Sequence, residues 1–370
     1  MSGGGPDAVG GAARCRARAL GLRPGIFPPG ALNAITDVAG VLVGQVTKRE
    51  GEFTRTGVTA IRPHGGNLFR ERVPAGLAVM NGFGKLAGAT QLQELGELES
   101  PIVLVNTLSV GRAMEAVVDW TLAQPGNEAV LSVNAVVGET NDGRLNDIRR
   151  RGIEGADVLA ALEGATAGPV AEGSVGAGTG TMAFGWKGGI GTSSRRLPEA
   201  LGGFTLGALV QSNYGGALLM DGHRVGEALG RFHLREHADK GDADGSVMVV
   251  LATDAPLSDR NLSRLALRAM AGLARTGAAF SDGSGDYAIA FSTHPGVRCP
   301  RDSYPDWPNE RMSPLFVAAI EAVEEAVLNS LTMATTIESR DPLTRRKRKG
   351  EAIDLGALRA LLAGRGAPAG

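Results

Sequence analysis

The sequence KGDADGSVMVVLAT, residues 240–253, joins a polar loop broken by glycines to a continuous run of apolar residues. The run from Val247 to Leu251 is rich in valine and follows turn-forming residues, which predicts a buried strand. Ser246 therefore lies at the start of a core strand, directly after Gly245. A serine at the first position of a core strand, next to a polar loop, is a candidate nucleophile.

This position also suits self-cleavage of the chain. A glycine before the nucleophile lets the backbone bend without strain at Cβ, so the Ser246 hydroxyl could attack the carbonyl of Gly245. An N-to-O acyl shift and hydrolysis would free Ser246 as a new N-terminus. Its α-amine, with an ordinary pKa of about 7.7 to 8, could then serve as the base for its own hydroxyl. The Gly-Ser pair also occurs at 173–174 and 283–284, so the pair alone favours an ordinary turn.

Short strand-like runs alternate with amphipathic helical segments over residues 21–340, with no internal repeat or linker. This mixture predicts a single α/β domain in which helices cover sheets. The expected strands are residues 57–62, 76–81, 102–106, 129–137, 205–212, 247–253 and 287–293. The expected helices are residues 87–98, 110–122, 223–234, 259–276 and 313–331.

The two ends of the chain differ in composition from this domain. Residues 1–20 are rich in Gly, Ala and Arg and are expected to form a flexible tail. Residues 341–370 contain the basic run Arg345-Arg346-Lys347-Arg348-Lys349 and are expected to form a mobile extension. The basic run could contact nucleic acid, but a solvated extension is the favoured interpretation.

The overall composition excludes several classes of protein. The 38 basic and 39 acidic side chains leave a net charge of -1, so no general attraction to nucleic acid or to an anionic membrane is expected. No apolar run approaches the ~18 residues of a membrane span, and the N-terminus lacks the apolar core of a secretory signal. Two cysteines in unrelated contexts fit a reducing compartment. We therefore expect a cytoplasmic protein without nucleic-acid or membrane partners.

Two other motifs could indicate a different kind of site. His233-Leu-Arg-Glu-His237 fits the inverted zinc-peptidase pattern, but the sequence ADKGDADG that follows breaks the helix which such a site needs. The glycine-rich run 173–181 could bind an anion, although it matches no phosphate-loop pattern and is better interpreted as a tight loop near another backbone. We accordingly expect neither a metal nor an organic cofactor.

A series of short motifs over residues 16–340 gives a more specific indication. The motifs are LNAITDV at 32–38, GVTAIRP at 57–63, VLVNT at 103–107, ETNDGRLND at 139–147, GAGTG at 176–180, VQSN at 210–213, DGSV at 244–247, ATDAPL at 252–257, GSGD at 283–286 and IAFST at 289–293. In order and number these motifs resemble those of the DmpA-type aminopeptidases, which are self-processing serine peptidases that include L-aminopeptidase/D-esterases and β-peptidyl aminopeptidases.

This resemblance implies an αββα sandwich of four layers, of the N-terminal-nucleophile type. It further implies cleavage between Gly245 and Ser246 into an α chain, residues 1–245, and a β chain, residues 246–370. The two chains are expected to stay associated, and four copies are expected to form a homotetramer.

The resemblance also assigns roles to single residues. Ser246 matches the nucleophile, and Asn213 matches the side-chain amide that stabilises an oxyanion. Ser284 and Asp286 match the hydroxyl and carboxylate that relay protons near the new amine. Asp286 stands where Glu is expected in members that cleave β-peptides, so its carboxylate lies one methylene closer to the backbone.

Two further positions concern the substrate, which is expected to be a peptide, amide or ester with a free amino group. Glu139 is a candidate partner for the substrate's ammonium group, or else an ordinary loop carboxylate. Asn141 stands where the D-esterase members are expected to carry Tyr, which would remove a phenol from the acyl pocket. Two alternatives remain open: an acyltransferase on the same fold, and an uncleaved, inactive homologue that acts as a binding protein.

Overall fold

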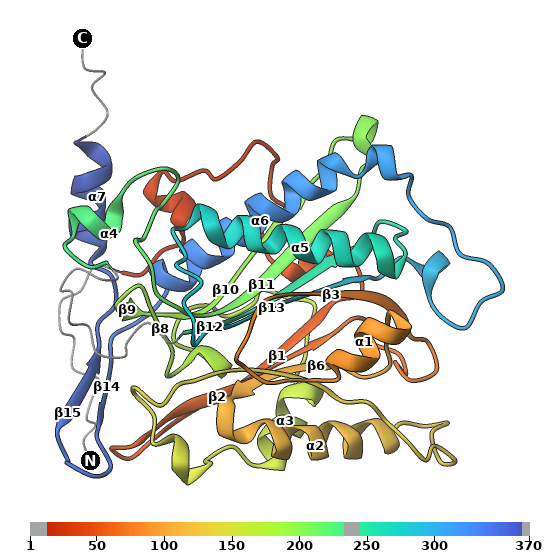
Figure 1. Cartoon of the computed structure of the whole chain (residues 1–370), viewed down its shortest axis with the longest axis horizontal. Helices are drawn as coiled ribbons and strands as arrows, with labels where there is room; N and C mark the ends of the chain where they lie inside the picture. Colours follow the sequence, from red (N-terminus) through yellow and green to blue (C-terminus); the bar gives the residue numbers. More distant parts are fainter. Residues whose placement is uncertain (1–12, 233–244, 365–370) are drawn as a thin grey trace, which may run out of the picture.

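Four layers make up the protein, as seen in a computed structural model that describes residues 13–232 and 245–364. Two β-sheets pack face to face, with helices α5 and α6 covering one outer face and helices α2 and α3 covering the other (Figure 1). The predicted αββα sandwich is therefore confirmed. Within the described residues, no helix is long and apolar enough to cross a membrane.

The larger sheet carries the predicted nucleophile. Its order is β10-β11-β12-β13-β3-β5, in which β12 and β13 pair in parallel and the other neighbours pair antiparallel. The strands are β10 (Gly189–Arg196), β11 (Thr205–Asn213), β12 (Ser246–Thr253), β13 (Gly285–Ser292), β3 (Val73–Gly82) and β5 (Glu97–Leu98). Since β12 and β13 are parallel, their N-terminal ends meet at one edge of the sheet, together with the C-terminal ends of β11 and β3.

The second sheet has the order β1-β2-β6-β7-β4. Its strands are β1 (Leu42–Glu50), β2 (Thr54–Arg62), β6 (Ile102–Asn106), β7 (Val136–Thr140) and β4 (Leu86–Ala87). Helices α2 (Val110–Leu122) and α3 (Gly155–Glu163) bury Val117, Trp120, Val158 and Leu162 against it. Between the two sheets lies an apolar core that includes Ile61, Leu104, Leu209, Val250 and Ile289.

The outer helices of the larger sheet form where the sequence predicts them. In α5 (Asp259–Arg275), the side chain of Ser258 caps the first turn by accepting a hydrogen bond from Asn261 N. Leu262, Leu265, Ala266 and Ala269 recur at three- and four-residue spacing and are all buried. Helix α6 (Ser313–Thr332) lies beside it, with a proline in its first turn.

Most expected elements are confirmed within a few residues, and the differences have physical reasons. The expected strand 129–137 is wrong over most of its length, because only β7 at its end pairs with a neighbour. The expected helix 223–234 shrinks to the single turn α4 (Val225–Ala228), and α1 (Ala89–Leu95) is likewise shorter than predicted. Strands β1 and β10 and helix α3 were missed, because glycine and polar residues interrupt their apolar patterns.

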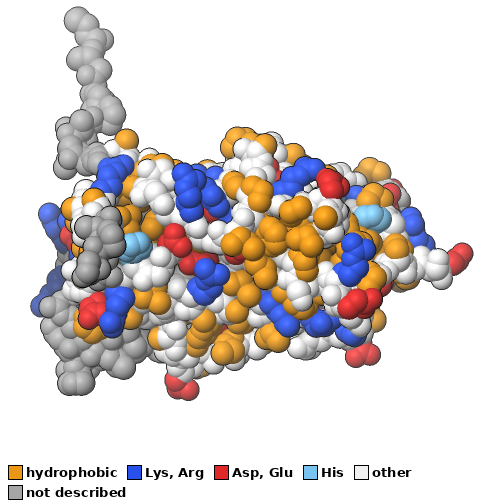
Figure 2. Space-filling model, turned by 90° about the horizontal axis from the view of Figure 1, so that it is seen from above, with side chains coloured by type: hydrophobic (Ala, Val, Ile, Leu, Met, Phe, Trp, Pro, Cys, Tyr) orange, Lys and Arg blue, Asp and Glu red, His pale blue; other side chains and the backbone are white. Residues whose placement is uncertain are grey.

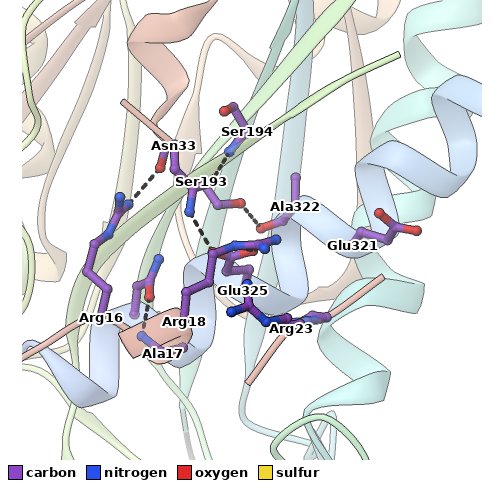
Figure 3. Close-up of polar contacts among 12 residues, drawn as sticks. Arg16, Ala17, Arg18, Arg23, Asn33, Ser193, Ser194, Glu321, Ala322 and Glu325 are labelled. Carbon is purple, nitrogen blue, oxygen red and sulfur yellow. Dashed lines mark hydrogen bonds and ion pairs between the residues drawn. The ribbon is translucent and has the colours of Figure 1, made fainter. Parts of the chain in front are cut away.

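The prediction of a flexible tail over residues 1–20 is wrong for residues 13–20, the part that the structure describes. Arg18 donates hydrogen bonds of 2.8 and 3.0 Å to the buried carboxylate of Glu325 on α6, and the two side chains meet in Figure 3. The backbone N–H of Ala17 donates to Asn329 on the same helix. These contacts dock the segment in the helical layer, which a composition rich in Gly and Ala does not reveal.

The predicted mobile extension also proves to be folded up to residue 364. Strand β15 (Lys347–Gly350) contains most of the basic run and pairs with β14 (Ile337–Arg340). Helix α7 (Leu355–Ala363) then buries Leu355 and Leu358 in the core. Several of the basic side chains form ion pairs with acidic residues, as Arg345 does with Glu52. The basic run is therefore part of a folded hairpin and not a free charged tail. A small hairpin of β8 (Met182–Ala183) and β9 (Trp186–Lys187) completes the fold.

Candidate active site

Ser246 is the first residue of β12 and lies in the middle of the larger sheet, where it is buried. Its register partner on β11 is Asn213, and its register partner on β13 is Gly285. The hydroxyl of Ser246 accepts a 3.4 Å hydrogen bond from the N–H of Gly285. The structure thus brings the predicted nucleophile and the predicted oxyanion residue to the same edge of the sheet.

Gly245 leaves no room for a side chain. A Cβ at this position would lie 2.4 Å from Tyr214 Cα and 2.5 Å from the carbonyl oxygen of Asn213. Close packing therefore gives a steric reason for glycine at this position. The carbonyl oxygen of Gly245 accepts a 3.3 Å hydrogen bond from Gly285 N–H, the same donor that contacts the Ser246 hydroxyl.

A buried hydroxyl–carboxylate pair lies beside Ser246. The Ser284 hydroxyl donates a 2.6 Å hydrogen bond to Asp286 Oδ1, and both residues are buried. Asn81 on β3 donates a 3.1 Å hydrogen bond to Asp286 Oδ2. Burial raises the pKa of Asp286, and the hydrogen bonds from Ser284 and Asn81 oppose this rise.

The side-chain amide of Asn213 is oriented by a hairpin next to it. Its Oδ1 accepts a 2.9 Å hydrogen bond from the backbone N–H of Met182 at the start of β8. Since the oxygen of the amide is used in this contact, the Nδ2 group is the end of the amide that can donate to a negatively charged oxygen. The residue is 6% exposed, so a hydrogen bond made there is little weakened by water.

Glu139 reaches this site from the second sheet. It lies near the end of β7, is 2% exposed, and accepts hydrogen bonds from the N–H of Lys85, at 3.0 Å, and from the hydroxyl of Thr107. A Cβ on Gly84 would lie 3.2 Å both from Glu139 Oε1 and from Gly285 Cα. Gly84 therefore lies between the carboxylate and Gly285, the first residue of β13, which contacts Ser246.

Asn141 stands apart from the other predicted residues. It is exposed, and its Oδ1 accepts a 2.9 Å hydrogen bond from Gly143 N–H in its own loop. Among residues 13–232 and 245–364 the structure gives no hydrogen bond between Asn141 and the Ser246 group. A role for Asn141 in the substrate pocket stays a prediction.

Three contributors to the site were not singled out from the sequence. Asn81 donates to Asp286, Gly84 lies so close to Glu139 that a side chain would not fit, and Tyr287 donates a 2.9 Å hydrogen bond to the Gly84 carbonyl. Asn81 ends an expected strand and Tyr287 begins another, but sequence spacing does not say which strands are neighbours. Tyr287 lies near Glu139, and burial followed by this negative charge raises the pKa of its phenol.

The competing motifs add no second site to the described structure. Residues 13–232 and 245–364 contain no cluster of three or more His, Cys, Asp or Glu that could hold a metal ion. The motif from His233 to His237 lies outside the described residues. The glycine-rich loop packs tightly against other backbone, as predicted: a Cβ on Gly178 would lie 2.4 Å from Ile190 N, and one on Gly180 would lie 2.2 Å from Arg55 O.

Comparisons with known proteins agree with this geometry. The model of peptidase family S58 matches residues 33–345. The β-peptidyl aminopeptidase BapA of Sphingosinicella xenopeptidilytica is 40% identical over 348 residues, which cover 87% of this chain and 86% of that protein. A Burkholderia sp. β-aminopeptidase superposes with a TM-score of 0.85 at 40% identity, covering 95% of this chain and 99% of its own. The L-aminopeptidase D-Ala-esterase/amidase of Ochrobactrum anthropi, described as a variant of the Ntn hydrolase fold, superposes with a TM-score of 0.84 at 38% identity over the same shares.

Proposed function

The chain belongs to peptidase family S58 and is an aminopeptidase, and we propose that it activates itself by cleaving the bond between Gly245 and Ser246. The observation that carries this proposal is the position of Gly285 N–H, which contacts both the Gly245 carbonyl oxygen and the Ser246 hydroxyl. One donor thus holds the nucleophile beside the carbonyl that it attacks and polarises that carbonyl.

The cleavage proceeds in two steps, an N-to-O acyl shift and the hydrolysis of the resulting ester. Ser246 Oγ adds to the Gly245 carbonyl carbon, the hydroxyl proton passes to the leaving amide nitrogen, and the peptide bond becomes an ester. Water then hydrolyses this ester, so Gly245 ends as a carboxylate and Ser246 regains its hydroxyl and gains a free α-amine. The products are an α chain of residues 1–245 and a β chain of residues 246–370.

The two chains stay together because their strands alternate in one sheet. β12 and β13 of the β chain lie between β11 and β3 of the α chain, with ladders on both sides. Buried ion pairs add a second link, since Arg18 and Arg195 of the α chain contact Glu325 of the β chain at 2.8 and 2.9 Å. Separation would break both strand ladders and expose the apolar core between the sheets to water, which is very costly.

In turnover, the freed amine of Ser246 takes the proton of its own hydroxyl, and Oγ attacks the substrate carbonyl to form an acyl-enzyme. Asn213 Nδ2 donates to the developing oxyanion. Ser284 and Asp286 hold the amine and return its proton to the leaving group. Water releases the acyl group by the reverse path, and no step requires a metal or a cofactor.

The substrate is a peptide, amide or ester with a free amino group at its N-terminus. Glu139 supports this class, because it is a buried carboxylate on the same side of Gly84 as Gly285, the residue that contacts Ser246, and a carboxylate there would bind an ammonium group strongly. Two curated relatives are named β-peptidyl aminopeptidases, so we propose that N-terminal β-residues are accepted.

A substrate pair tests this function directly. The processed enzyme should release p-nitroaniline from β-alanyl p-nitroanilide and should leave the N-acetylated form uncut. Equal rates on both would overturn the amine requirement, and Ser246→Ala should remove all turnover. Chelators should leave the rate unchanged, since a serine mechanism needs no metal.

The assembly and location of the enzyme belong to the same proposal. We propose a homotetramer, supported by apolar side chains that gather on the outer helical layer (Figure 2), where Leu267 and Val317 are 53% and 37% exposed. We also propose a cytoplasmic location, which the free thiols of Cys15 and Cys299 support.

A further inference from the structure

Asn81 occupies a position that neither the proposed mechanism nor the family motifs use. It lies near the end of β3, directly opposite Asp286 in the register of β3 with β13. The register shifts at this point: Asp286 pairs with Asn81 and Tyr287 pairs with Val79, so Met80 is the extra residue of a bulge. Bulges turn side chains in a new direction and are frequent beside active sites.

The amide group of Asn81 makes three contacts. Asn81 Nδ2 donates to Asp286 Oδ2 at 3.1 Å, to the Phe280 carbonyl at 2.9 Å and to the Ser281 carbonyl at 3.1 Å. Phe280 has a φ of 47°, an unfavourable conformation for an aromatic residue. The loop that holds Phe280 and Ser281 leads directly into Ser284. Asn81 therefore fixes both the carboxylate and the loop that carries its hydrogen-bond partner.

The two carboxylate oxygens of Asp286 therefore accept hydrogen bonds from different donors. Oδ2 accepts from Asn81, which leaves Oδ1 to accept the 2.6 Å hydrogen bond from Ser284. Without the amide donor the buried carboxylate could rotate, and its ionised form would lose one of its two side-chain donors. The short side chain of an aspartate keeps the carboxylate close to its own strand, within reach of the opposite strand.

We propose that Asn81 is a positioning residue that holds Asp286 ionised and turned toward Ser284 during turnover. This inference rests on the proposed function of Asp286. Other ionisable groups also face Asp286: Tyr214 after β11, Tyr287 on its own strand and, after cleavage, the α-amine of Ser246 on β12. The two phenols stay neutral near pH 7, because burial raises the pKa of both, so the amine is the one partner that changes charge there.

The test uses processed enzyme and compares Asn81→Leu, which has a similar size but no donor, with Asn81→Asp, which places a second carboxylate beside the first. In Asn81→Leu, kcat should fall roughly 10- to 100-fold with little change in KM, as expected for loss of a hydrogen bond to a charged group. The acid limb that reports protonation of Asp286, below the range in which the amine titrates, should move to higher pH in both variants. It should move further in Asn81→Asp, because like charges raise the pKa of a carboxyl group.

A matched control and a double variant complete the design. Asn309→Asp makes the same substitution at an exposed residue whose Oδ1 accepts from Arg260 and Arg264, and it should leave kcat and the acid limb unchanged. In an Asp286→Asn background, Asn81→Leu should cost much less than it does alone. An unchanged acid limb in both Asn81 variants, or full additivity with Asp286→Asn, would overturn the inference.

The design also covers a variant that does not fold and a wild type that is inactive. If Asn81→Leu does not fold, Asn81→Asp and Asn81→Ser carry the test through their pH profiles, and Ser should fall between wild type and Asp because it keeps one donor. If the processed wild type lacks activity, the proposed function itself fails. If the wild type is active and the Asn81 variants match it, the inference alone fails.

Discussion

Asn213 and Ser246 are register partners at the meeting ends of two antiparallel strands, β11 and β12. The amide that we propose to stabilise the oxyanion thus lies on the strand next to the proposed nucleophile. Met182 N–H orients this amide by donating to its Oδ1 at 2.9 Å. The distance between the amide donor and the Ser246 hydroxyl is set by the pairing of two strands rather than by a loop. Because a sheet is rigid, the donor is held in place before the substrate binds.

The first prediction concerns this amide. Asn213→Ala should lower kcat about 10²- to 10³-fold with a small change in KM, because the donor acts mainly on the charge that develops in the transition state. Asn134→Ala, at an exposed residue that contacts Glu99, should leave kcat unchanged. The measurement is steady-state hydrolysis by processed enzyme. A rise in KM with constant kcat would instead indicate a role in substrate binding.

The second prediction concerns recognition of the free amine. Glu139→Gln keeps an oxygen that can accept from Lys85 N–H but removes the negative charge. KM for β-alanyl p-nitroanilide should rise about tenfold or more, since a charge-assisted hydrogen bond is lost. Glu338→Gln, on the exposed face of β14, is the matched control and should have no effect. An unchanged KM in Glu139→Gln would make Glu139 an ordinary structural carboxylate.

The third prediction concerns the space around the scissile bond. Gly245→Ala places a methyl group 2.4 Å from Tyr214 Cα, so the chain must shift there and self-cleavage should slow strongly. Gly111→Ala in α2 meets no atom within 4 Å and should be processed at the normal rate. Gel electrophoresis of freshly purified protein over time separates the two cases. Normal cleavage of Gly245→Ala would show that the close packing is not needed.

The fourth prediction concerns the buried charges that link the proposed chains. Glu325 is fully buried and accepts from Arg18, Arg195 and Asn33. Glu325→Ala leaves these donors without their partner and should cost about 3 to 5 kcal/mol, or roughly 4 to 6 °C in Tm for a chain of this size. Glu199→Ala breaks an exposed pair with Arg196 and should not change Tm measurably. Equal effects of the two variants would contradict the account.

The sequence predicts much of this fold because its strands and helices have clean patterns. The run 247–251 and the helix after Ser258 are examples, and β6 and α2 begin and end where predicted. The pairing of distant segments was not predicted, because nothing in the local sequence shows that Asn81 faces Asp286 or that Glu139 lies near Gly84 and Gly285. The docking of residues 13–20 was not predicted for the same reason, because Arg18 and Glu325 are far apart in the sequence and come into contact only in the folded protein.

The most direct test of the account is the intact mass of the purified protein after incubation at neutral pH. We predict two chains of 245 and 125 residues, the second beginning at Ser246, which elute together under native conditions. Ser246→Ala should remain one chain of about 38 kDa. A wild-type protein that stays uncut yet hydrolyses aminoacyl substrates, or a cut at another bond, would contradict the central claim.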